Sequence, residues 1–377
     1  MTASPVRHPG ELRWETRLLV VITGVLTAFG ITSLYAAATL QDNAFGMALG
    51  QLVGAIFGGM LILLVSRIDY HAWRPLAWPL LLAAIVALII PLLPFTHDIA
   101  PRVNGARRWV DIGPLNFQPS EAARFAVIVW TAMLAAKKGD AVRGFKKGVA
   151  PFLVMIGLVS LLILLEPNLS MAVLVALIGG VVLFVAGAKI GHFLLLGVGA
   201  FFATLWLIWV SPYRLERARC LVVPCEGGGD YQLSQALIGF GAGGPVGVGF
   251  GHGQLKMNYL PYAYSDFLFS TIGEEWGFLG VLIIVSLFTI LCWLGFRIAK
   301  SAPDPFGQFL AAGITASIAL SAVLHMLVTL GLMPTTGLSL PFMSHGRSGL
   351  IIALLSVGVL VSIGRMRGRA PRVSGER

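Results

Sequence analysis

Asp266 is the residue of this sequence whose type and position are best suited to chemistry. It lies between a polar stretch and a long apolar run, in a region with few other acids. Partial burial at such a boundary raises the pKa of a carboxyl group towards that of a useful general base. Asp is also a preferred N-cap residue, so helix capping is the alternative interpretation. The scarcity of other acids in the same region favours the catalytic or ligand role.

Glu121 and Arg124 form a second candidate pair. Residues 118–121 read Gln-Pro-Ser-Glu, a pattern typical of the first turn of a helix. A helix brings positions 121 and 124 together, so the acid either complements the helix dipole or pairs with Arg124 in a polar cleft. Arginines upstream favour an anionic ligand, because guanidinium groups bind phosphate bidentately, with contact to lipid headgroups as the alternative. These are Arg102, Arg107 and Arg108.

Two glycine-rich segments add backbone groups to these candidates. Residues 243–253 lack the Gly-Lys-Ser/Thr ending of a nucleotide-binding P-loop, so they fit either ordinary turns or a backbone cradle for a diphosphate. Residues 330–347 contain two prolines and several glycines, which predicts a broken helix lining a cavity. Arg347 would then point into this cavity or lie at its rim.

Apolar segments must position these side chains, because the composition is that of a membrane protein. Hydrophobic residues make up 57% of the 377 residues, charged residues only 12%, and the mean hydropathy is +0.85. A soluble domain has about a quarter of its residues charged. The apolar runs are continuous and lack the alternation of a β-barrel, so we predict an all-α polytopic membrane protein. The net charge of +10 does not indicate nucleic acid, because the basic residues form short clusters between apolar runs.

About ten transmembrane helices are expected, each needing roughly 20 apolar residues. Their approximate positions are 18–40, 45–65, 75–94, 122–136, 149–165, 169–187, 190–210, 267–296, 308–332 and 346–364. The first run is too long for a cleaved signal peptide, which predicts an uncleaved anchor. The membrane domain thus covers 18–366, between tails at 1–17 and 367–377. A large loop at 211–265 separates spans seven and eight and is expected to contain a helix at 230–241.

The distribution of basic residues predicts the orientation of the chain. Ten spans place both termini on one side, and most of the 27 Lys and Arg residues fall on that side. The positive-inside rule therefore predicts cytoplasmic termini, with loop 211–265 and Asp266 on the outer face. Cys220 and Cys225 share the outer loop, where a disulfide is one alternative and free thiols are the other. The sequence contains no metal-ligand cluster.

A series of motifs resembles one family, the SEDS proteins (shape, elongation, division and sporulation), which include FtsW, RodA and SpoVE. The resemblance covers nearly the whole chain, from Arg17 to about Arg365. Its motifs lie at 104–109, 118–121, 166–170, 213–217, 231–235, 259–261, 265–269, 273–277 and 332–337. Residues 337–341 read Gly-Leu-Ser-Leu-Pro, which resembles FtsW more than RodA, because RodA usually has Pro where Ser339 stands. Two departures are His325, where the family usually has Asn, and segment 344–349, which reads Ser-His-Gly-Arg-Ser-Gly.

The resemblance implies a peptidoglycan glycosyltransferase that polymerises lipid II on the outer face of the bacterial cytoplasmic (inner) membrane, for septal or shape-related wall synthesis. The family's presumed catalytic aspartate falls on Asp266, its first-loop glutamate on Glu121, and its usual lysine on Arg124. Further substrate-binding candidates are Arg107, Arg108, Lys256, Ser344 and Arg347. The implied partners are lipid II, membrane lipid, a class B penicillin-binding transpeptidase, and divisome or elongasome proteins. No cofactor is required by the sequence, although Mg²⁺ or Mn²⁺ could share the charge of the leaving group.

Two alternatives belong to other functional classes. A lipid II transporter, or flippase, would present polar residues through the full depth of its spans, often with internal repeats. The polar residues here lie mainly at the outer rim, and we find no internal repeat in the sequence. A non-catalytic scaffold for a transpeptidase would give no reason for a carboxylate in an outer cleft. One assay, polymerisation of labelled lipid II, tests both alternatives.

Overall fold

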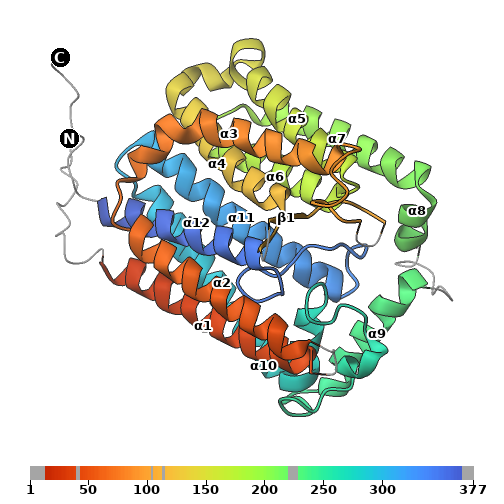
Figure 1. The fold of residues 1–377 in the computed structure, drawn as a ribbon. Helices are drawn as coiled ribbons and strands as arrows, with labels where there is room; N and C mark the ends of the chain where they lie inside the picture. Colours follow the sequence, from red (N-terminus) through yellow and green to blue (C-terminus); the bar gives the residue numbers. More distant parts are fainter. Residues whose placement is uncertain (1–12, 40–42, 103–104, 113–114, 220–227, 367–377) are drawn as a thin grey trace.

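Helices dominate the computed structural model, which describes residues 13–39, 43–102, 105–112, 115–219 and 228–366 (Figure 1). The helices are α1 (Arg13–Ala37), α2 (Ala44–Val65), α3 (Trp73–Ile89), α4 (Pro119–Lys138), α5 (Ala150–Leu165), α6 (Leu169–Val185), α7 (Ile190–Val210), α8 (Pro212–Arg219), α9 (Gly228–Gly243), α10 (Leu268–Lys300), α11 (Pro305–Thr329) and α12 (Arg347–Met366). Two short strands, β1 (Val110–Ile112) and β2 (Leu115–Phe117), pair antiparallel. Shorter turns of 3₁₀ or π geometry lie at Tyr70–Ala72, Ile90–Leu92, Gly139–Arg143, Phe145–Val149 and Leu255–Tyr259.

All ten predicted spans are helices, α1–α7 and α10–α12. Eight stretches containing these helices are long and apolar enough to cross a membrane, and α6 is a shorter apolar helix. The remaining span, α4, has a lower hydropathy because it carries charged residues near both ends. The protein is therefore an α-helical polytopic membrane protein, as predicted. The helix expected at 230–241 is α9, whereas α8 and the β1–β2 hairpin were not predicted.

Local sequence explains where several helices begin and end. Asn168 caps α6 by accepting a hydrogen bond from the Met171 amide at 3.3 Å. Pro119 occupies the first turn of α4, where a missing amide hydrogen costs nothing. Gly139 ends α4 with a φ of +51°, a conformation that glycine adopts without steric cost. These signals fix the ends of the helices that carry the candidate site.

The centre of the bundle consists of α4, α11 and α12, whose residues are mostly buried. Helix α12 packs along α2, while α11 packs against α10, α4 and α6 (Figure 1). Helix α7 lies at the edge of the bundle, and none of its described side chains is buried. The candidate residues on α4 therefore lie in the protein interior.

Residues 243–253 stabilise a break in α10. Gly277 has φ +62° and ψ −162° and interrupts the helix, which frees backbone groups on both sides. The loop satisfies them: the amides of Val248 and Gly249 donate to the carbonyls of Glu274 and Glu275 at 3.0 and 3.1 Å. A Cβ on Gly247 would lie 2.2 Å from the Glu275 oxygen, so only glycine permits this approach. The sequence left ordinary turns and a diphosphate cradle as alternatives for residues 243–253, and this geometry supports turns.

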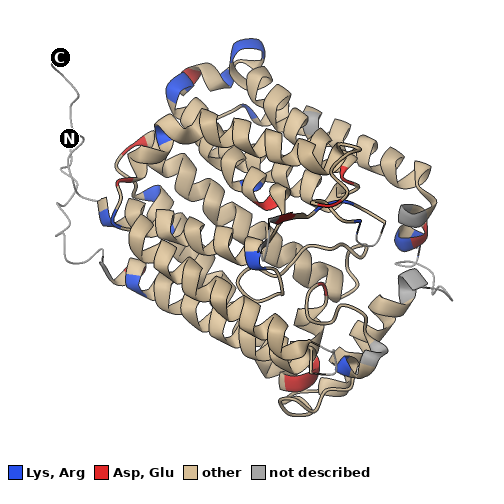
Figure 2. Cartoon of the chain, in the orientation of Figure 1, with Lys and Arg blue, Asp and Glu red and all other residues tan. Residues whose placement is uncertain are grey.

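The two ends of the bundle differ in charge (Figure 2). Helix α1 begins and α12 ends at the same end, as an even number of spans requires. Lys and Arg residues gather at this end and on the adjoining connections between helices. The predicted tails 1–17 and 367–377 lie largely outside the described residues, and α1 already begins at Arg13. Cys220 and Cys225, for which a disulfide and free thiols were the two alternatives, also lie outside the described residues.

Candidate active site

Asp266 lies in the loop immediately before α10 and does not cap that helix. The N-cap position is Phe267, and no side chain forms a capping hydrogen bond there. The Asp266 amide donates to the Tyr262 carbonyl at 3.1 Å, which holds the residue in a turn. A Cβ on Gly337 would lie 3.9 Å from Asp266 Oδ2, so the carboxylate faces the segment that connects α11 and α12. The capping interpretation of Asp266 is therefore wrong.

The surroundings of Asp266 raise its proton affinity while keeping it ionisable. Burial raises the pKa of the Asp266 carboxyl to about 6, against the opposing effects of a hydrogen bond from Ser265 and the charges of Arg217 and Arg108. At neutral pH such a group is mostly ionised yet accepts protons far better than an exposed aspartate. This is the balance that a general base needs.

Two arginines from distant parts of the sequence supply positive charge beside Asp266. Arg108 precedes β1; its Nε donates to the Glu166 carbonyl at 3.2 Å and its Nη2 donates to the Pro167 carbonyl. Arg217 lies on α8, and its Nη1 donates to the Thr335 carbonyl at 3.1 Å. Backbone carbonyls thus hold both guanidinium groups in place. Arg108 was a predicted candidate, whereas Arg217 was included only in the motif at 213–217.

Glu166 is a second carboxyl group at this end, and the sequence analysis included it in the motif at 166–170 without naming it as a site residue. It follows α5 directly, is 1% exposed, and neither of its side-chain oxygens has a hydrogen-bond partner among the described residues. Burial raises its pKa to about 8, opposed by the charge of Arg108. An acid directly after an apolar span was the available signal in the sequence.

Glu121, Arg124 and Ser344 line a pocket beneath the connecting segment 330–346. Glu121 Oε2 pairs with Arg124 Nη2 at 2.7 Å, and Arg124 Nη1 donates to Ser321 Oγ at 3.0 Å. Ser344 Oγ accepts the Leu340 amide at 3.0 Å, which folds the segment over the pocket. The predicted ion pair is therefore present in the structure.

Segment 330–346 joins this pocket to Asp266. It is extended and turned, so the predicted cavity lining is present but the broken helix is not. Gly337 faces Asp266, whereas Ser339 lines the pocket, only two residues later. The His345 amide donates to the Tyr264 carbonyl at 3.1 Å and ties the loop carrying Asp266 to the end of the segment.

The remaining predicted site residues lie elsewhere in the structure. Arg107 donates to the Leu93 carbonyl at 3.4 Å and contacts His97. Lys256 donates to the Gly251 carbonyl inside the glycine-rich loop. Arg347 lies over α2, where a Cβ on Gly50 would be 3.5 Å from its Cδ. The structure thus brings Asp266 and Arg108 together, and separately Glu121, Arg124 and Ser344.

His325, the departure on α11, is fully enclosed next to segment 330–346. Its Nδ1 hydrogen-bonds with the Leu338 carbonyl at 2.7 Å, so this nitrogen carries the proton. Its Nε2 has no hydrogen-bond partner within the described part of the chain. The histidine therefore anchors the segment one residue before Ser339 enters the pocket.

A family model named for FtsW, RodA and SpoVE and described as "Cell cycle protein" matches residues 11–368. The chain belongs to this family. Family membership agrees with the helical membrane fold and with the motifs that surround Asp266.

Relatives of the FtsW, RodA and SpoVE family extend over nearly all of this chain. A probable peptidoglycan glycosyltransferase FtsW of Trichlorobacter lovleyi is 38% identical over 366 residues, which cover 95% of each chain. Stage V sporulation protein E of Bacillus subtilis is 35% identical and covers 92% of this chain and 96% of its own.

Solved structures of the family share the fold. A chain in a peptidoglycan synthase complex, described as coordinating polymerization and crosslinking, matches with a TM-score of 0.78 and 28% identity over 93% of this chain and 97% of that chain. The rod shape determining protein RodA of Thermus thermophilus matches with a TM-score of 0.69 and 27% identity over 93% and 96%. The arrangement of helices described here is therefore that of the family.

Proposed function

We propose that this member of the family is a peptidoglycan glycosyltransferase that polymerises lipid II, with Asp266 as its catalytic base. The relatives named as such enzymes support the reaction class. The observation that carries the residue assignment is the state of Asp266: its carboxylate is partly buried, does not cap α10, and lies beside Arg108 and Arg217. The family resemblance alone does not explain why this aspartate is suited to proton transfer.

The proposed reaction is one displacement with inversion at the donor sugar. Asp266 accepts the proton of the 4-hydroxyl group on the acceptor N-acetylglucosamine, and that oxygen attacks the anomeric carbon of the donor muramic sugar. The bond from this carbon to undecaprenyl diphosphate breaks, and the diphosphate leaves with the electron pair. Guanidinium groups held in advance near this negative charge lower the barrier. Arg108 and Arg217 are the assigned groups.

A divalent cation carried by the leaving diphosphate would neutralise the same charge. Among the described residues, no three His, Cys, Asp or Glu side chains are grouped to hold a metal ion. Oxygen ligands suit Mg²⁺ and Mn²⁺, and diphosphate oxygens can supply them. Polymerisation assays with EDTA, and with either ion added back, test this part of the proposal.

The pocket at Glu121, Arg124 and Ser344 is proposed to bind a polar part of lipid II. Arg107, Lys256 and Arg347 would contribute only if the outer segments rearrange.

The chain is further proposed to reside in the bacterial cytoplasmic membrane with both termini in the cytoplasm. A class B penicillin-binding transpeptidase and divisome or elongasome proteins are the proposed partners. The match to a peptidoglycan synthase complex supports this assignment.

The decisive experiment reconstitutes the full chain with its transpeptidase in vesicles and supplies labelled lipid II. We expect wild type and the exposed-carboxyl control Asp98→Ala to produce glycan chains, and Asp266→Ala to produce none. Chains made by Asp266→Ala would refute the base assignment. If wild type makes none but moves lipid II between leaflets, the transporter alternative is correct. If it does neither while stimulating the transpeptidase, the scaffold alternative is correct.

A further inference from the structure

Glu166 is a buried acid for which the mechanism above has no use. It is 1% exposed at the outer end of α5, and both of its carboxyl oxygens are enclosed without a hydrogen-bond partner among the described residues. An ionised carboxylate in such surroundings loses its hydration without compensation, so the neutral acid is favoured. Burial accordingly raises the pKa of Glu166 to about 8. A neutral carboxylic acid is therefore the resting form near neutral pH.

Arg108 connects this acid to the proposed base. Its guanidinium group donates to the backbone carbonyls of Glu166 and Pro167, which fixes the cation at the turn between α5 and α6. From this place its charge lowers the pKa of both Glu166 and Asp266. One cation thus acts on two carboxyl groups that are 100 positions apart in sequence.

The protonation state of Glu166 decides how much of that charge reaches Asp266. A neutral Glu166 does not offset the positive charge of Arg108, so this charge acts on Asp266 and on an incoming diphosphate. Once Glu166 ionises, its carboxylate attracts the guanidinium and cancels much of its field, because opposite charges interact strongly where water is excluded. Other charged or titratable groups around this unit are Arg217, next to Asp266, Tyr264, and the two rings that contact Tyr264, Tyr262 and His345.

We propose that Glu166 is a positioning residue that works in its protonated form and leaves the charge of Arg108 available to Asp266 and to the leaving diphosphate. The proposal rests on the glycosyl transfer proposed above. It assigns Glu166 no contact with the reacting atoms. Its effect passes through Arg108, which donates to the Glu166 carbonyl at 3.2 Å.

The proposal predicts a pH-dependent loss of activity that belongs to Glu166. The reconstituted chain and its transpeptidase are supplied with labelled lipid II, and initial rates are measured from about pH 5 to about pH 9.5. A group with a pKa of about 8 keeps about a tenth of its protons at pH 9, so wild type should lose activity on the alkaline side. Glu166→Gln imitates the neutral acid, and we expect it to retain activity there, about tenfold above wild type at pH 9.

Two controls separate this role from a structural one. Asp98→Asn neutralises an exposed carboxyl on the same face and should reproduce the wild-type profile. Arg108→Gln removes the shared cation, so it should move the acidic limb of the profile, which reports Asp266, to higher pH. A Glu166→Gln profile that keeps the wild-type alkaline limb overturns the proposal. So does a Glu166→Gln protein that folds with the wild-type melting temperature but is inactive at every pH.

The outcome also distinguishes this proposal from the assignment of Asp266. If Asp266→Ala still polymerises lipid II, the base assignment fails whatever Glu166 does. If Asp266→Ala is inactive while Glu166→Gln and wild type have the same pH profile, only the role of Glu166 is refuted. If Arg108→Gln leaves the acidic limb unmoved, the link through Arg108 is refuted.

Discussion

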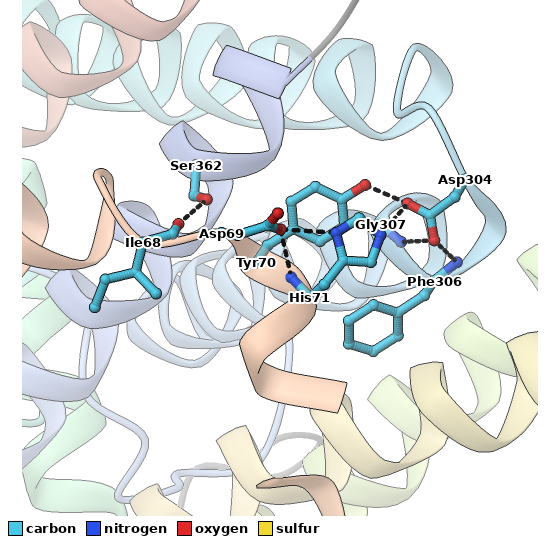
Figure 3. A network of polar contacts seen from close by, with 8 residues as sticks. All are labelled: Ile68, Asp69, Tyr70, His71, Asp304, Phe306, Gly307 and Ser362. Carbon is cyan, nitrogen blue, oxygen red and sulfur yellow. Dashed lines mark hydrogen bonds and ion pairs between the residues drawn. The ribbon is translucent and has the colours of Figure 1, made fainter. Parts of the chain in front are cut away.

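Asp266 and Asp304 each stand directly before a long helix, at opposite ends of the bundle, yet their carboxylates are used differently. Asp304 caps α11: its Oδ2 accepts the amides of Phe306 and Gly307 at 3.0 and 3.4 Å, and its Oδ1 accepts the Tyr70 hydroxyl (Figure 3). His71 Nε2 lies 3.5 Å from the same Oδ1. Asp266 makes no such cap at α10.

The difference shows that an aspartate placed before a helix can either cap it or keep its carboxylate available for another role. The Asp304 carboxylate accepts hydrogen bonds from the α2–α3 connection and from the start of α11, so it holds the α2–α3 and α10–α11 connections together. Burial raises the pKa of Asp266 to about 6, although the charges of Arg217 and Arg108 oppose the rise, and the residue stabilises no helix end. Sequence alone presents both as aspartates before an apolar run. We infer that the carboxylate of Asp304, which caps α11, serves stability, whereas that of Asp266, which caps no helix, is available for chemistry.

Breaking the Glu121–Arg124 ion pair should have the largest effect on stability. Glu121→Gln leaves the Arg124 guanidinium enclosed beside a neutral partner, and removing one member of a buried pair costs about 3–5 kcal/mol. Thermal unfolding in detergent measures the loss. Arg124→Lys keeps the charge and should cost far less. A Glu121→Gln protein as stable as wild type would show that this pair does not support the fold.

Removing the cap of α11 should have an intermediate effect on stability and almost none on catalysis. Asp304→Ala loses two amide partners, which costs about 1–2 kcal/mol. Asp304→Asn keeps a good N-cap residue and serves as the control. Polymerisation per folded molecule should stay within about twofold of wild type in both. A large loss of activity without a loss of stability would contradict the distinction between the two aspartates.

Removing one arginine should shift the pH dependence by a smaller amount. Because Asp266 must be deprotonated to act as a base, activity should rise with pH through about 6. The charge of Arg217 lowers the pKa of Asp266, so Arg217→Gln should move this rise to higher pH. A shift of about half a unit to one unit reduces the rate at pH 6 about two- to fivefold. Exposed Arg102 provides the control, since Arg102→Gln should leave the profile unchanged.

Much of the fold follows from the sequence because lipid imposes a simple rule. Each apolar run of sufficient length must form a helix, so all ten spans were predicted. The Glu121–Arg124 pair was also predictable, because a spacing of three within one helix fixes the distance between the two side chains. The helix over 230–241 followed from its apolar spacing in the same way.

The rest depends on contacts between segments far apart in the chain. The charges of Arg217 and Arg108 act on Asp266, and nothing local in these segments predicts that they meet. The break of α10 at Gly277 is satisfied by residues 243–253, which no helical pattern reveals. Glu166 has no side-chain partner among the described residues because of the way the α5–α6 turn is enclosed. Such features become visible only in three dimensions.

The most direct test of the central claim compares Asp266→Asn with Asp304→Asn in the same reconstituted preparation. The rate of glycan-chain formation from lipid II is measured per folded molecule, with the melting temperature recorded for each protein. We predict that Asp266→Asn loses at least about 10²-fold in rate without a loss of stability, whereas Asp304→Asn polymerises at nearly the wild-type rate. Glycan chains formed by Asp266→Asn at the wild-type rate would contradict the account.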